Sequence, residues 1–161
     1  MKVTTPKLIR WAGLSAVVAG IIFTAIEPTH PSINTSTFVI ITSFKTSISI
    51  FGLLGITGLY ARQVEETGWQ GLVGYLLLTI YYAVQMCISF IEPTILPLLT
   101  TIAPTFVESA LQLSGGTGEP TNLGGLTTVY SLASILYVLG SLLFGIAMFR
   151  ARILPRGAAA L

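Results

Sequence analysis

Four long apolar stretches alternate with shorter polar segments along this chain. Charged side chains stand at the ends of these stretches or between them, with the exception of Lys45, which lies inside the second. At a rise of about 1.5 Å per residue, about 20 apolar residues cross a hydrocarbon core of roughly 30 Å. The pattern therefore predicts four transmembrane helices, at about residues 9–27, 37–61, 69–91 and 124–149.

The composition indicates that lipid is the main solvent of this chain. Hydrophobic residues make up 53% of it and charged residues 9%, whereas about 25% of the residues in a soluble domain are charged. We therefore expect an all-α fold, an integral membrane four-helix bundle formed by one transmembrane domain over residues 1–161. A net charge of +2 excludes a nucleic-acid-binding protein, and a single cysteine excludes a disulfide scaffold.

The basic residues predict the orientation of the chain in the membrane. Seven of the eight flank the predicted helices on one side: Lys2, Lys7, Arg10, Arg62, Arg150, Arg152 and Arg156. Because Lys and Arg accumulate in cytoplasmic loops, we expect a multi-pass protein of a bacterial-type plasma membrane with both termini in the cytoplasm. No small-x-small cleavage site follows the first apolar stretch, so we expect it to be retained as a helix rather than removed as a signal peptide.

The outer loop over residues 93–122 divides into two parts. In the first part Pro104 suits the first turn of a short helix, with apolar residues on one side and Glu108 and Gln112 on the other. That apolar side would consist of Phe106, Val107, Ala110, Leu111 and Leu113. The pattern favours an interfacial helix over a plain loop. The second part, Ser114–Asn122, is expected to be a turn-rich connector.

An internal repeat relates residues 8–62 to residues 67–152. Three pairs of segments match in the same order: Trp11–Leu14 with Trp69–Leu72, Ile26–Thr29 with Ile91–Thr94, and Gly58–Arg62 with Ala147–Arg152. The repeat predicts two tandem transmembrane hairpins, related by an axis near the membrane normal. Inverted transporter repeats have their axis in the membrane plane instead.

A resemblance to a known type of protein rests on three segments: Gly58–Gln63, Gly68–Tyr75 and Trp11–Leu14. The chain resembles uncharacterised four-helix integral membrane proteins of bacteria. The resemblance implies the same tandem-hairpin architecture and assigns no catalytic or binding residue.

Lys45 is the most informative polar residue, because a charged Lys near the middle of a transmembrane helix costs about 2.5–3.5 kcal/mol. Ser49, Gly52 and Gly55 lie on its helix face, so we expect Lys45 to point into a packed interface. Its candidate partners are Glu27 and Glu92, at the outer ends of the first and third helices.

Two further polar stripes follow helical spacing and are expected to converge with Lys45 in the outer half of the bundle. The third helix carries Tyr82, Gln85, Ser89 and Glu92, and the fourth carries Tyr130, Ser134, Tyr137 and Ser141. The candidate cluster is therefore Lys45, Glu27, Glu92, Gln85, Tyr82 and Tyr137. Interhelical hydrogen bonding with one structural ion pair is favoured over a site for an anionic or polar headgroup, a quinone or another amphiphile.

His30 is the only histidine, which is too few for a zinc site of three or four ligands. It would suffice as the single protein ligand of a haem or pigment, although its flanking prolines favour an ordinary loop residue. The sequence contains no nucleophile–base–acid set and identifies no cofactor, so we do not expect an enzyme.

The expected function is that of a structural or accessory subunit of a larger respiratory or photosynthetic membrane complex, which provides helix packing and crevices for lipid, quinone or pigment. The alternative is a small homo-oligomeric transporter or amphiphile-binding protein that uses the cluster around Lys45. The expected partners are membrane lipids and other transmembrane subunits or copies of itself, and not nucleic acid.

Overall fold

The computed structural model describes residues 5–26, 29, 32–33, 36–115 and 123–152, and among these it contains helices and no strand. The helices are α1 (Thr5–Ile26), α2 (Ser36–Thr94), α3 (Leu96–Leu99), α4 (Pro104–Gly115) and α5 (Gly125–Ala151). Three of them, α1, α2 and α5, are long and apolar enough to cross a membrane. The prediction of an all-α fold is thus confirmed for the described residues, and three of the helices are consistent with membrane-spanning segments.

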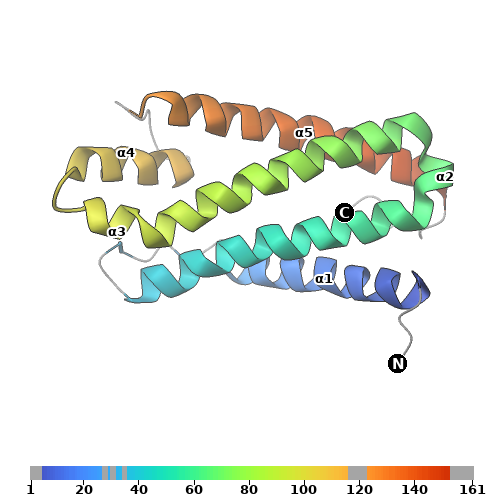
Figure 1. The fold of residues 1–161 in the computed structure, drawn as a ribbon, viewed down its shortest axis with the longest axis horizontal. Helices are drawn as coiled ribbons and strands as arrows, with labels where there is room; N and C mark the ends of the chain where they lie inside the picture. Colours follow the sequence, from blue (N-terminus) through green and yellow to red (C-terminus); the bar gives the residue numbers. More distant parts are fainter. Residues whose placement is uncertain (1–4, 27–28, 30–31, 34–35, 116–122, 153–161) are drawn as a thin grey trace.

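The long helix α2 folds back on itself at residues 63–68, as Figure 1 shows. Gln63 (φ −130°, ψ 16°) and Gly68 (φ 56°, ψ −154°) leave the helical conformation there. The backbone angles of Gly68 belong to a region that is open almost only to glycine. We call residues 36–62 the first arm and residues 69–94 the second arm. The ranges 37–61 and 69–91, predicted as separate helices, fall within these two arms.

The helices lie side by side in the order α1, first arm, second arm, α5 (Figure 1). Small residues allow the closest approaches between them. A Cβ atom added to Gly55 of the first arm would lie 2.8 Å from the Cβ of Ala16 in α1. One added to Gly74 of the second arm would lie 2.5 Å from the backbone nitrogen of Phe144 in α5. Both interfaces therefore depend on glycine in α2.

The two arms also contact each other along their length. Near the turn, the rings of Tyr60 and Tyr75 stack with their centroids 4.5 Å apart. Further along, Tyr82 lies against Gly52, where an added Cβ would be 2.6 Å from Cε1 of the tyrosine. Lys45 and Glu92 meet at the other end. The partners thus run in opposite directions along the chain, as antiparallel arms require.

The short helices α3 and α4 extend and then reverse the chain beyond the second arm (Figure 1). Helix α4 begins at Pro104, as predicted, and buries Val107 and Ala110 against Leu96 of α3 and Leu123, while Glu108 is exposed. The helix was therefore correctly favoured over a plain loop. One boundary was wrong, because Ser114 lies in the last turn of α4 and not in the connector.

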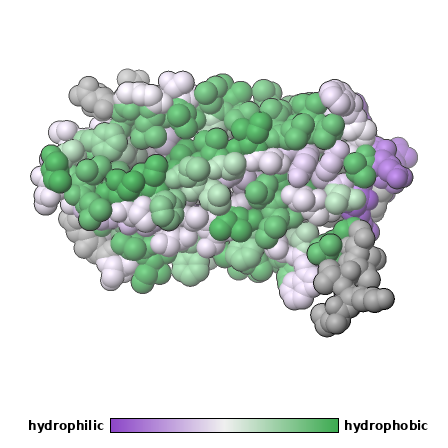
Figure 2. All heavy atoms as spheres, viewed as in Figure 1, coloured by the Kyte–Doolittle hydropathy of each residue, from purple (hydrophilic) through white to green (hydrophobic). Residues whose placement is uncertain are grey.

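The face of the molecule in Figure 2 is largely apolar, and strongly hydrophilic side chains gather at one end of it. That end contains the start of α1, the turn of α2 and the end of α5, so five of the six described basic residues lie there together, all except Lys45 (Figure 1). These are Lys7, Arg10, Arg62, Arg150 and Arg152. Arg150 donates a hydrogen bond of 3.0 Å to Oε1 of Gln70, which ties the end of α5 to the second arm.

The side chain of Gln63 at the turn is fully buried, and within the described residues neither its Oε1 nor its Nε2 has a hydrogen-bond partner. Leaving a buried polar group unsatisfied costs about 1–3 kcal/mol. We expect Gln63→Met, which keeps the chain length and removes both polar atoms, to raise the free energy of unfolding by about 1 kcal/mol. Denaturant titration in mixed micelles, followed by circular dichroism, measures this change.

Gln112 of α4, which is only partly buried, provides the control. Gln112→Met is expected to change the free energy of unfolding by less than about 0.5 kcal/mol. If Gln63→Met instead destabilises the protein while Gln112→Met does not, the amide of Gln63 has a partner in the membrane-embedded protein and our interpretation is wrong.

Candidate functional site

The candidate site is built around an ion pair between the two arms of α2. Lys45 extends from the first arm, and its Nζ lies 3.3 Å from Oε2 of Glu92 near the end of the second arm. The side chain of Lys45 is 36% exposed, whereas that of Glu92 is only 7% exposed. The structure thus pairs Lys45 with one of its two predicted partners, while the other, Glu27, lies outside the described residues.

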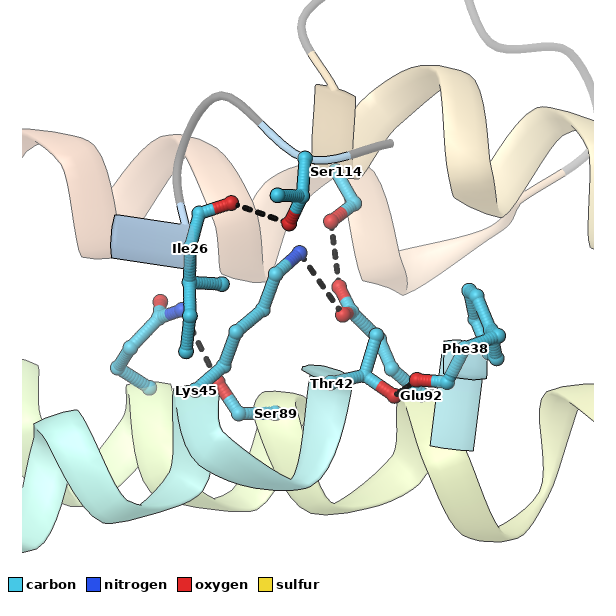
Figure 3. Close-up of polar contacts among 9 residues, drawn as sticks. Ile26, Phe38, Thr42, Lys45, Ser89, Glu92 and Ser114 are labelled. Carbon is cyan, nitrogen blue, oxygen red and sulfur yellow. Dashed lines mark hydrogen bonds and ion pairs between the residues drawn. The ribbon is translucent and has the colours of Figure 1, made fainter. Parts of the chain in front are cut away.

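A third group joins this pair from α4, because Ser114 donates a hydrogen bond from Oγ to Oε1 of Glu92. Figure 3 shows the side chains of Lys45, Glu92 and Ser114 pointing toward one another from the first arm, the second arm and the end of α4. Each carboxylate oxygen of Glu92 therefore has one donor. No sequence pattern pointed to Ser114, since a serine beside two glycines is typical of a connector.

An apolar crevice of about 140 Å³ opens beside Glu92, between the second arm, α3, α4 and α5. Its walls are mainly aliphatic and aromatic, and include Ile88, Ile91, Leu96, Phe106, Ala110 and Leu126. Glu92 and Tyr130 are the polar residues among those that line it, and Lys45 is not a lining residue. An apolar cavity of about 150 Å³ is large enough to bind a benzene molecule.

The burial of Glu92 explains why it is held by two donors. A carboxylate that is largely removed from water needs a countercharge and hydrogen bonds to remain ionised. Lys45 supplies the countercharge on one oxygen and Ser114 a hydrogen bond on the other. A carboxylate has about four lone-pair positions, so Glu92 can accept further donors from the side of the crevice.

The remaining predicted residues do not all join this site. Gln85 donates a hydrogen bond of 3.3 Å to Oγ of Ser89 within the second arm. Tyr82 lies ten residues before Glu92, which is about 15 Å along a helix. Tyr137 packs against Tyr81, with ring centroids 4.9 Å apart, and is 47% exposed. The contacts of these two tyrosines are thus with Gly52 and Tyr81, and their convergence with Lys45 stays a prediction.

Tyr130 is the stripe residue of α5 that does reach the site, since it lines the same crevice as Glu92. It was part of the predicted polar stripe but not of the candidate cluster. His30 lies outside the described residues. Within the described part of the chain, no group of three or more His, Cys, Asp or Glu side chains could hold a metal ion.

Comparisons with protein-family models, with curated proteins and with solved structures find no significant match to this chain. The resemblance to four-helix bacterial membrane proteins therefore stays a prediction. The site combines an ion pair, a hydroxyl donor and an apolar crevice that Glu92 and Tyr130 line as its polar residues.

Proposed function

We propose that this chain is a structural or accessory subunit of a larger membrane complex of the respiratory or photosynthetic type. The observation that carries the proposal is the exposure of α1. Only 6% of the apolar segment of α1 is buried inside the molecule, compared with 28% for α2 and for α5. A helix that its own chain leaves uncovered, with small residues such as Gly13 and Gly20, offers a surface on which another transmembrane helix can pack.

In this proposal the chain forms a four-helix bundle of two tandem hairpins. When Trp11 is aligned with Trp69 in sequence, Ala16 aligns with Gly74. When Gly58 is aligned with Ala147, Gly55 aligns with Phe144. The close approaches in the two hairpins are Ala16 to Gly55 and Gly74 to Phe144, so they join equivalent positions. This correspondence supports a duplicated hairpin. The glycine of the close contact lies in the second helix of the first hairpin and in the first helix of the second hairpin.

The proposed orientation places both termini in the cytoplasm of a bacterial-type cell. It is supported by the gathering of five of the six described basic residues at one end of the helices, with Lys45 as the exception, and by the placement of α3 and α4 at the other end (Figure 1). Helix α4 would then lie at the outer membrane interface.

The crevice beside Glu92 suits the second part of this proposal, which is that the subunit holds a lipid, quinone or pigment between its helices. The same crevice favours the alternative function, a homo-oligomeric transporter or amphiphile-binding protein that uses the ion pair of Lys45. The two functions differ in whether other transmembrane chains accompany this one.

The test is gentle detergent extraction from the native host, followed by native electrophoresis, mass spectrometry and an absorption spectrum of the band. We expect comigration with subunits of a large membrane complex. We also expect Val17→Trp, on the exposed face of α1, to weaken comigration, because the larger side chain would prevent a partner helix from packing closely on this face. Leu142→Trp on α5 is the matched control, since the two side chains are 56% and 57% exposed.

A band that contains only copies of this chain would contradict the accessory function and favour the alternative. Equal effects of Val17→Trp and Leu142→Trp would show that α1 is not the contact surface.

A further inference from the structure

We propose that the crevice beside Glu92 binds a single aliphatic chain whose headgroup donates hydrogen bonds, either a hydroxyl or an ammonium group, and that it rejects carboxylate and phosphate headgroups. This inference rests on the proposed function, in which the crevice holds an amphiphile. It narrows the lipid, quinone or pigment of that proposal to an amphiphile with an uncharged or cationic headgroup that donates hydrogen bonds.

The size and walls of the crevice define the apolar part of the ligand. A volume of about 140 Å³ is close to that of cavities that accept a six-carbon ring, so about six carbons of a chain fit. The walls come from four helical segments, and α4 contributes Phe106 and Ala110. A longer chain would continue from the crevice into the surrounding lipid.

The polar edge of the crevice defines the headgroup. Glu92 is ionised in its pair with Lys45, and it accepts one hydrogen bond on each oxygen from Lys45 and Ser114. Its remaining lone pairs can accept only from a donor, because an ionised carboxylate has no proton to give. Tyr130 adds a hydroxyl that is hydrogen-bonded to Ser114 and keeps a lone pair for a donor headgroup.

The placement of Lys45 argues against an anionic ligand. Its ammonium lies on Oε2 of Glu92 and does not line the crevice, so a negative headgroup entering the crevice meets the carboxylate first. Two like charges at such a short distance in an apolar environment repel strongly. A quinone, which carries only acceptor oxygens, would find no donor other than Tyr130.

The test uses the purified chain in phosphatidylcholine nanodiscs and three photoreactive probes with a diazirine at the fifth carbon: dodecan-1-ol, dodecylammonium and dodecanoate. Labelled peptides are identified by mass spectrometry. We expect the alcohol and the ammonium to label peptides that contain Ile88, Phe106 or Leu126 about tenfold more than dodecanoate does, the effect of one hydrogen bond to a charged group.

Two variants test the site and its charge separately. Ala110→Phe fills the crevice and should abolish labelling there, whereas Ala83→Phe, on an exposed part of the second arm, should leave it unchanged. The double variant Lys45→Met with Glu92→Gln removes both charges. In this double variant, labelling by dodecylammonium should not exceed labelling by the alcohol. Labelling by dodecanoate should rise at least severalfold.

Equal labelling by the three probes in the unmodified chain, or labelling that is confined to lipid-facing peptides, would overturn the inference. Should Ala110→Phe fail to fold, the double variant still decides it, because its readout is a change in headgroup preference. The measurement uses the isolated chain. A native band that contains only copies of this chain would therefore contradict the accessory function and would not affect the labelling result.

Discussion

Replacing Gly74 by alanine is expected to lower the free energy of unfolding by about 1–3 kcal/mol, the usual effect of forcing an extra carbon into a packed interface. The new Cβ would lie 2.5 Å from the backbone nitrogen and 2.8 Å from the Cα of Phe144. Backbone atoms cannot rotate away as a side chain can, so α5 must move as a whole. We therefore expect the second arm and α5 to separate.

The measurement is denaturant titration of Gly74→Ala in mixed micelles, monitored by circular dichroism. Gly145→Ala is the matched control, because it makes the same change in the neighbouring helix α5 at a position where an added Cβ has nothing within 4 Å. This control is expected to raise the free energy of unfolding by up to about 1 kcal/mol, the difference in helix propensity between alanine and glycine.

The opposite signs make the pair of variants decisive. If both variants stabilise the protein, the close contact of Gly74 with Phe144 does not exist in the membrane. If both destabilise it, glycine is needed in α5 for a reason other than this contact.

The positions of the long helices could be predicted because lipid imposes a simple rule, about 20 residues with almost no charge. The start of α4 at Pro104 was equally accessible, since proline suits a first helical turn. The tight reversal of α2 was not. The gap between the predicted helices 37–61 and 69–91 indicates a loop there. In the structure, only Gln63 and Gly68 of this segment leave the helical conformation.

The candidate site was harder to predict than the fold because helical spacing gives the face of a residue and not its height in the bundle. Tyr82 and Glu92 share a face of the second arm, yet about 15 Å of helix separates them. The stripe therefore contains both Glu92, which pairs with Lys45, and Tyr82, which contacts Gly52 further along the arm. Ser114 could not be found at all, because its role depends on how α4 folds back toward the second arm.

The choice of partner for Lys45 also depended on tertiary structure. The repeat places Glu27 and Glu92 at equivalent helix ends, so the sequence alone does not distinguish them. Within the described residues, the antiparallel arms of α2 bring Glu92 to Lys45. This pairing leads to a test of what the ion pair contributes.

Lys45→Met is expected to lower the free energy of unfolding by about 2–3 kcal/mol, below the 3–5 kcal/mol typical of fully buried pairs, because Lys45 is partly exposed. The variant leaves the carboxylate of Glu92, which is 7% exposed, without its countercharge. Glu92→Gln is expected to cost only about 0.5–1 kcal/mol, because an ammonium that is 36% exposed can turn toward water.

The double variant Lys45→Met with Glu92→Gln completes the cycle, and unfolding titrations of the four proteins in mixed micelles give the coupling energy. We expect the double variant to lie within about 1 kcal/mol of the unmodified protein, since it leaves no unpaired charge. The coupling is then about 2 kcal/mol. Lys7→Met, at an exposed position at the start of α1, is the control for loss of a lysine and should have almost no effect.

Additive effects of Lys45→Met and Glu92→Gln would mean that the two side chains do not interact. A larger loss for Glu92→Gln than for Lys45→Met would mean that the carboxylate matters for its contact with Ser114 more than for the ion pair.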